Sequence, residues 1–278
     1  MDPGLNPLDL MNRAALVGAG FTEDTAGSQT FFFAGDGVPL ILLHGAGDHA
    51  GAWSRAAAPL VAAERYRIII LDLAGHGASG PAEGTLTMET FLEGLDAVAC
   101  KAGTTPVTLV GNSFGAWLAI VWASLHPERV SRIIAVNGGP VTGLRPDLTL
   151  TPADHEEARR LWQALVAPDK WPVPDFVLDE LIRKSRVGAM RRMDPEFLRP
   201  HLMDDRLPQI ETPVDLLWGE ADQVLPLEYA RLLEAGLPRV RFTAIAGCGH
   251  VPQMEAPDRF NQALRDILDQ PPPGRKTS

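Results

Sequence analysis

Short apolar runs rich in Val, Ile and Leu recur along the chain and predict the strands of a sheet. They lie at residues 31–34, 40–43, 67–73, 107–111, 132–137, 214–219 and 240–246. In most of them apolar residues follow one another instead of alternating with polar ones. Such continuous runs are typical of strands buried on both faces, so the pattern predicts a mostly parallel sheet covered by helices.

Segments with helical periodicity lie between these runs. Residues 118–125 carry large apolar side chains at helical spacing, and Pro127 then ends the helix. Further helices are predicted at 8–17, 226–235 and 257–268, and the first dozen residues are otherwise expected to form an arm. The alternation of strands and helices predicts an α/β fold with helices on both faces of the sheet.

The alternation breaks between residues 143 and 207. This segment is rich in proline and arginine, carries two helix-like runs and has no run that predicts a strand. We therefore expect a helical cap, residues 143–206, inserted into an α/β core formed by residues 1–142 and 207–278.

Composition and charge narrow the class of protein. The chain has 278 residues and a formal net charge of −10, without a stripe of Lys and Arg, which argues against nucleic acid as a partner. Its two cysteines, Cys100 and Cys248, do not make a disulfide framework and suit a reducing compartment. Neither a secretory signal nor a membrane-length apolar run is recognised, so we expect a cytoplasmic protein that does not associate with a membrane.

A serine stands at the junction between a predicted strand and a predicted helix. The segment Gly111-Asn112-Ser113-Phe114-Gly115 follows the strand directly and opens the helix. So tight a turn forces the serine into strained dihedral angles, and the flanking glycines let the neighbouring backbones approach. The hydroxyl group is then exposed at the edge of the sheet, beside the free N–H groups of a helix N-terminus. We therefore predict that Ser113 is a nucleophile.

A serine hydroxyl group is a weak nucleophile and needs a base within hydrogen-bonding reach. His250 lies between the last predicted strand and the last helix, which places it at the same edge of the sheet as Ser113. Asp222 follows strand 214–219 at that edge and is the predicted carboxylate partner of the base, with Glu220 as its nearest rival. The other histidines are expected to have structural or surface roles.

Two backbone N–H groups are expected to stabilise the oxyanion formed when the serine attacks an acyl carbon. One is the N–H of Phe114, next to the nucleophile, and the second comes from loop 44–47, where Ala46 is preferred and Gly45 is the alternative. The residues expected in the substrate pocket are Gly45, Asn112, Trp53, Trp162 and Val251.

We expect neither a metal nor a cofactor. His44, Asp48 and His49 lie close enough in sequence to be read as metal ligands, but a tight loop explains His44 better. The segment Gly18-Ala19-Gly20 follows a helical run instead of a strand and lacks the third glycine of a nucleotide-binding motif. Cys248 is expected to be a small packing residue.

Taken together, these motifs resemble the α/β-hydrolase superfamily. The matching blocks are HGAG followed by Trp53, DLAGHGAS, GNSFG, WGEADQVLP and GCGHVPQMEAP, which span residues 38–260. The chain order of Ser113, Asp222 and His250 is also that of the superfamily. The resemblance implies an α/β-hydrolase fold with these three residues as the catalytic triad.

The resemblance also bears on the branch of the superfamily. A serine nucleophile argues against the haloalkane dehalogenases and epoxide hydrolases, which use an aspartate. The Asn-Ser pair of GNSFG is similar to that of the meta-cleavage-product C–C bond hydrolases, but those enzymes usually carry tryptophan where this chain has Val251. They also use a cap arginine to bind the substrate carboxylate, for which Arg183, Arg186 and Arg191 are the candidates here.

We therefore expect a cofactor-independent serine hydrolase that cleaves an ester or lactone of a small carboxylic acid through an acyl-enzyme on Ser113. Three alternatives stay open: a C–C bond hydrolase of the meta-cleavage-product type, a perhydrolase, and a non-catalytic small-molecule receptor with the same fold. The expected partner is a small-molecule substrate, and a homodimer formed through the cap or an edge strand is compatible with this fold.

Overall fold

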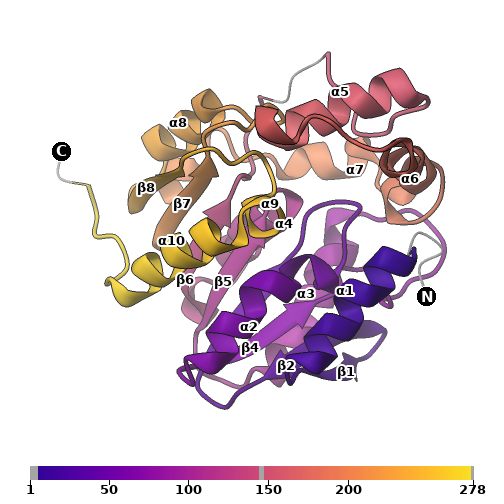
Figure 1. The fold of residues 1–278 in the computed structure, drawn as a ribbon. Helices are drawn as coiled ribbons and strands as arrows, with labels where there is room; N and C mark the ends of the chain where they lie inside the picture. Colours follow the sequence, from indigo (N-terminus) through magenta and orange to yellow (C-terminus); the bar gives the residue numbers. More distant parts are fainter. Residues whose placement is uncertain (1–5, 144–146, 277–278) are drawn as a thin grey trace.

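The computed structural model describes residues 6–143 and 147–276, and its centre is one eight-stranded sheet (Figure 1). The strand order is β1-β2-β4-β3-β5-β6-β7-β8. The strand β2 is antiparallel to both β1 and β4, and all other neighbouring pairs are parallel. The strands are β1 Thr22–Ala26, β2 Gln29–Ala34, β3 Val38–Leu43, β4 Tyr66–Leu71, β5 Val107–Asn112, β6 Val130–Val136, β7 Val214–Gly219 and β8 Val240–Ile245. The predicted mostly parallel sheet is confirmed.

Helices cover both faces of this sheet, as predicted. The α-helices are α1 Pro7–Gly18, α2 Ser54–Ala62, α3 Met88–Lys101, α4 Phe114–Leu125, α5 His155–Leu165, α6 Asp175–Arg186, α7 Pro195–Leu198, α8 Leu227–Gly236, α9 Pro252–Glu255 and α10 Pro257–Asp269. Short 3₁₀ turns, among them η1 Ala50–Trp53, join several of them.

Each face of the sheet has its own hydrophobic core. Because successive side chains of a strand point to opposite faces, Ile41 and Leu43 pack into the core that includes residues of α3, α4 and α8. Their neighbours Leu40 and Leu42 pack into the other core, with residues of α1, α2 and α10. Burial on both faces explains why these strands lack alternating polar residues.

The helix predicted at 8–17 is confirmed, and it takes in part of the segment that was expected to be an arm. From Pro7 onward the chain forms α1, which begins with a capping box in which Asn6 and Asp9 each accept a hydrogen bond from the other's backbone N–H group. The helix packs beside α2 (Figure 1) and buries Leu16 in the core. Residues 1–5 of the expected arm lie outside the described residues.

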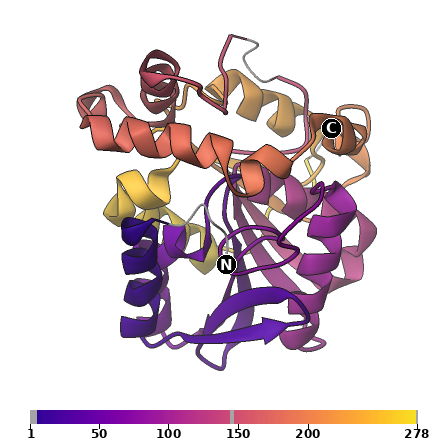
Figure 2. The same cartoon turned by 90° about the vertical axis from the view of Figure 1, so that its right-hand side faces the viewer.

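Helices α5, α6 and α7 lie between β6 and β7 in the sequence and form a layer across one end of the sheet (Figure 2). They share a small core of their own, made by Ala158, Leu178 and Ile182. In the described residues of this segment, the only β-type contact is an isolated bridge between Leu86 and Met193. The cap boundaries at 143 and 206 stay predictions, and residues 144–146 lie outside the described residues.

Within residues 6–143 and 147–276, no helix is both long enough and apolar enough to cross a bilayer.

Candidate active site

Ser113 is the single residue between β5 and α4. Its φ angle is positive, with φ 53° and ψ −117°. The turn needs glycine on both sides. A Cβ atom on Gly111 would lie 2.3 Å from the carbonyl oxygen of Gly115, and one on Gly115 would lie 2.4 Å from that of Leu43. The sequence therefore forms this turn because only glycine lets the three backbones approach, and the turn presents the Ser113 hydroxyl group at the carboxyl end of the sheet.

The structure brings the three predicted catalytic side chains together. His250 Nε2 lies 2.9 Å from Ser113 Oγ, and His250 Nδ1 lies 2.8 Å from Asp222 Oδ2. His250 and Asp222 are buried, and the serine is partly exposed toward a cavity. With the Nδ1–H group donating to Asp222, Nε2 is left as the acceptor that faces the serine hydroxyl group.

The carboxylate of Asp222 is held by more than the histidine. Its Oδ2 atom also accepts a hydrogen bond from Asn137 Nδ2 at 2.6 Å, and Oδ1 accepts from the N–H groups of Val224 and Leu225 at 2.8 and 2.9 Å. Asn137 also accepts a hydrogen bond from Gly219 N–H, and it adopts a left-handed conformation with φ 48°. Sequence reasoning missed Asn137, although an asparagine that ends a strand at this edge was a usable signal.

Asn112, expected in the substrate pocket, lines the cavity but also connects parts of the protein. Its Nδ2 group donates to the carbonyl oxygens of Val136 and His250, and its Oδ1 atom accepts from Gln253 Nε2 at 3.1 Å. Gln253 is fully buried and was not identified from the sequence. These bonds fix the backbone of the residue before the nucleophile to the loop that carries the base.

The loop after β3 offers the N–H groups of Gly45 and Ala46 as candidates for the second oxyanion donor. Gly47 N–H donates to His76 Nε2 at 3.1 Å, which removes it from consideration. Gly45 lies so close that an added Cβ would be 3.3 Å from Ser113 Cβ. Phe114 is the first residue of α4, so its N–H group has no partner within the helix. Phe114 therefore remains the expected donor beside the nucleophile, and Ala46 remains the expected second donor with Gly45 as the alternative.

His44 serves this loop as a neutral, buried ring. Its Nε2 atom accepts a hydrogen bond from Leu73 N–H at 2.9 Å, and its Nδ1 atom lies 2.8 Å from the carbonyl oxygen of Gly45. Burial lowers the pKa of His44 from 6.5 to about 4. Among the described residues, no three His, Cys, Asp or Glu side chains are grouped as a metal site would require.

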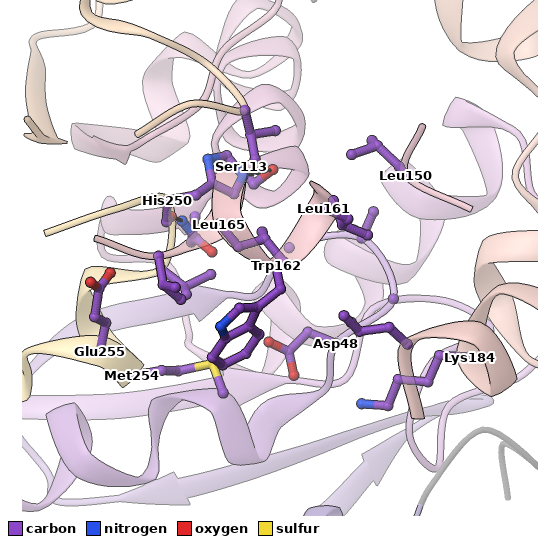
Figure 3. A pocket seen from close by; sticks show the side chains of 18 of the residues that line it. Asp48, Ser113, Leu150, Leu161, Trp162, Leu165, Lys184, His250, Met254 and Glu255 are labelled. Atoms are coloured by element: carbon purple, nitrogen blue, oxygen red, sulfur yellow. Dashed lines mark hydrogen bonds between the residues drawn. The ribbon is translucent and has the colours of Figure 1, made fainter. Parts of the chain in front are cut away.

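A cavity of about 580 Å³ lies between the cap and the catalytic residues (Figure 3). Ser113 and His250 are at its wall, and the cap contributes Leu161, Trp162 and Leu165 from α5. Gly45, Asn112, Trp162 and Val251, all expected in the pocket, line it.

Trp53 does not belong to this cavity, contrary to expectation. It is fully buried on η1 beneath the site, where its ring packs against Phe260 with centroids 6.0 Å apart. The side chain is part of the core between α2 and α10, because η1 turns it toward the sheet and away from the cap.

The cations at the cavity are not the arginines expected from the sequence. Arg183 pairs with Glu180, Arg186 donates to the carbonyl oxygen of Ala153, and neither these nor Arg191 lines the cavity. The lining cations are Arg55, Lys170 and Lys184.

Lys184 links the cap to the N-terminal helix. Its Nζ atom lies 3.1 Å from Asp9 Oδ2, and Asp9 Oδ1 is 3.1 Å from His49 Nε2. Burial raises the pKa of Asp9, but the His49 hydrogen bond and the Lys184 charge outweigh it and lower the pKa from 3.8 to about 2. Asp9 and Lys184 both line the cavity, at the end where α1 meets α6.

The described geometry has counterparts among known proteins. Residues 40–263 match the alpha/beta hydrolase family. The chain is 31% identical to a 2-hydroxy-6-oxononadienedioate/2-hydroxy-6-oxononatrienedioate hydrolase of Paraburkholderia phymatum, over 83% of this chain and 87% of the relative. It is 28% identical to a 2-hydroxy-6-oxo-6-phenylhexa-2,4-dienoate hydrolase of Burkholderia cepacia, over 84% and 88% of the two chains.

A crystal structure of similar fold is that of a membrane phospholipase A described as a bacterial virulence factor. It is 27% identical to this chain, covers 94% of this chain and 90% of its own, and superposes with a TM-score of 0.79. The family match covers most of the chain, and the sheet, the nucleophile turn and the strand-end positions of Asp222 and His250 are those that the sequence motifs imply. The protein is a hydrolase of the alpha/beta hydrolase family.

Proposed function

We propose that this protein hydrolyses an ester or lactone of a small carboxylic acid through an acyl-enzyme on Ser113. The observation that carries the proposal is the continuous chain of contacts from Ser113 Oγ through His250 to Asp222, at 2.9 and 2.8 Å. A serine so placed has a base for its proton, and the base has a buried carboxylate that fixes its tautomer.

In the proposed reaction, Ser113 Oγ attacks the acyl carbon while its proton passes to His250 Nε2. The N–H groups of Ala46 and Phe114 stabilise the negative charge that develops on the acyl oxygen. The bond to the leaving oxygen then breaks as His250 returns the proton to it, leaving the acyl group on Ser113. Water attacks that acyl group, gives a proton to His250, and the acid leaves as Ser113 Oγ regains the proton.

The cavity favours a small, largely apolar acyl group. Its volume of about 580 Å³ lies within the range of small-molecule sites. Leu161, Leu165 and Val251 form apolar wall near the reacting atoms, whereas the charged residues Asp9 and Lys184 stand where α1 meets the cap. We therefore expect the reacting end of the substrate to be apolar and any polar group to lie farther from the ester bond.

An acyl-enzyme can be tested by the way its products partition. Several esters of one acid, with different alcohols, are hydrolysed in the presence of methanol, and the ratio of free acid to methyl ester is measured. A shared acyl-enzyme predicts the same ratio for every leaving alcohol, and no turnover by Ser113→Ala. Ratios that change with the leaving alcohol contradict the intermediate, and binding without turnover supports the receptor alternative.

A second candidate is hydrolysis of a C–C bond in a vinylogous diketone. It is supported by two relatives at 28–31% identity whose names describe such dienoate and dienedioate substrates. The candidate requires a cation for the substrate carboxylate, and Arg55, Lys170 or Lys184 would have to supply it in place of the cap arginines. Turnover of a ring-fission diketone that exceeds turnover of matched esters would favour this candidate over the first.

A further inference from the structure

The C-terminal end of α5 is bonded directly to the two loops that carry the catalytic acid and base. The carbonyl oxygen of Ala164 accepts a hydrogen bond from Gln223 N–H at 3.1 Å, next to Asp222. The carbonyl oxygen of Leu165 accepts from the N–H group of His250 itself at 2.7 Å. These are the carbonyl groups that the end of a helix leaves without a helical partner, so the catalytic loops satisfy them.

The approach of cap and base loop is close enough to exclude a side chain. A Cβ atom on Gly249 would lie 2.3 Å from the carbonyl oxygen of Leu165 and 2.8 Å from Val166 Cα. The backbone before His250 is therefore in contact with the cap backbone, and the position of one constrains the position of the other.

One carboxylate, that of Glu255, bonds to both sides of this contact. Glu255 Oε2 accepts a hydrogen bond from Gly249 N–H at 2.7 Å, and Glu255 Oε1 accepts from Ala167 N–H at 2.7 Å. Glu255 ends α9 and lines the cavity near Met254 (Figure 3). The same side chain thus holds the residue before the base and the cap segment that follows α5.

We propose that Glu255 is a positioning residue that sets the place of His250 by tying its loop to the cap. The inference rests on the proposed function, because it assigns the effect to the reaction of Ser113. Glu255 contacts neither Ser113 nor His250 in the hydrogen bonds of the described residues, so its effect passes through Gly249 and the cap. The C-terminal end of α5 therefore helps to fix the position of His250.

The substitution Glu255→Gln tests this while keeping the size of the side chain. The amide has one oxygen and one NH₂ group, so only one of the two N–H donors keeps an acceptor and the other faces a second donor. We expect kcat for ester hydrolysis and the rate of Ser113 labelling by a fluorophosphonate to fall roughly ten- to a hundred-fold through misplacement of the base. KM should stay within a factor of about three, since the lining side chains are otherwise unchanged.

The matched control is Glu228→Gln, which removes the same charge at an exposed site on α8. It should label and turn over like the wild type. If Glu255→Gln labels at the wild-type rate, or loses rate only in proportion to a loss of folded protein seen in its melting curve, the positioning role is wrong.

A readout that does not depend on turnover separates this inference from the proposed function. In protein with ¹⁵N-labelled histidine, the proton that His250 shares with Asp222 should give a low-field NMR signal. Glu255→Gln is expected to shift or broaden that signal and Glu228→Gln to leave it unchanged. If the wild type does not react with the fluorophosphonate, the proposed function alone is rejected. If the NMR signal is the same in Glu255→Gln as in wild type, the positioning role is rejected.

Discussion

At the scale of single residues, the site depends on a carboxylate, that of Asp222, both of whose oxygen atoms accept two contacts each. Asp222 accepts from His250, from Asn137 and from two backbone N–H groups, and these four hydrogen bonds offset the cost of burying its carboxylate. In the proposed mechanism this carboxylate orients the imidazole and stabilises it when it carries the proton of Ser113.

Replacing Asp222 by Asn should therefore lower kcat by on the order of a thousand-fold or more, because the amide can donate a proton to His250 Nδ1 and so favour the wrong tautomer. Steady-state kinetics with the best ester, together with a melting curve, provide the check. Glu220→Gln serves as the control, since Glu220 is exposed and its substitution should leave the rate unchanged. If kcat fell in Glu220→Gln and not in Asp222→Asn, Glu220 would be the carboxylate partner of His250 instead.

His44 gives a pH-dependent prediction for stability. Burial lowers its pKa from 6.5 to about 4, so between these values the unfolded chain binds a proton that the folded chain does not. This contribution to the free energy of unfolding is complete above about pH 6.5 and is lost as the pH falls to about 4, with a slope of one proton. Urea denaturation across that range should show a slope that is larger in wild type than in His44→Gln by about one proton. Equal slopes would contradict the neutral, buried assignment.

At the scale of elements, α1 is part of the catalytic cavity and joins the cap to the core. Lys184 on α6 reaches Asp9 on α1, and Asp9 in turn contacts His49 at the start of η1. The ion pair lies at one end of the cavity, where α6 of the cap meets α1 of the core. It is a second contact between the cap and the core, besides the one at the end of α5.

The substitution Asp9→Asn should lower the melting temperature at pH 7 by about 2–4 °C. Because the folded-state pKa of Asp9, about 2, lies below its ordinary value of 3.8, the carboxylate stabilises the fold above pH 3.8 and loses that effect as the pH falls through about 2. Denaturation curves at a series of pH values should thus show a difference between variant and wild type that shrinks toward pH 2. A difference that is constant with pH would show that charge is not its cause.

The elements that the sequence predicted well are those whose burial leaves a strong pattern. The run 67–73 and most of its counterparts form strands that are largely buried on both faces, whereas the run 240–246 is only partly buried. Each run appears as a strand within two residues of its expected ends. The strand β1 was missed because four of its five residues, Thr22–Thr25, are exposed, so an edge strand with the sequence TEDTA carries no apolar signal.

The three candidate catalytic residues and four of the five expected pocket residues followed from position along the chain, whereas Trp53 and the cations of the cavity did not. Ser113, Asp222 and His250 each follow a predicted strand, and parallel strands bring their carboxyl ends to one edge. Which cap cation faces the cavity depends on helix rotation: Lys184 points in and its neighbour Arg183 pairs with Glu180. Trp53 was misplaced for the same reason, since its direction is set by a 3₁₀ turn that the sequence did not reveal.

At the scale of the whole molecule, the sheet positions the candidate catalytic residues and the cap encloses the cavity beside them. The sheet brings Ser113, Asp222 and His250 together, because each follows the carboxyl end of a strand. The cap layer covers that edge of the sheet and leaves a cavity beside Ser113 (Figures 2 and 3). Contacts at the end of α5 and at the Asp9–Lys184 pair hold the two layers together on opposite sides of the cavity.

The assignment of Ser113 as an activated nucleophile is tested most directly by covalent labelling of the folded protein with a fluorophosphonate, read by intact mass. We expect one adduct on wild type, none on Ser113→Ala, and slow labelling of the His250→Ala variant, because the serine is reactive only with its base. An adduct that persists in Ser113→Ala, or folded wild type that takes up no label, would contradict the assignment of Ser113 as the activated nucleophile.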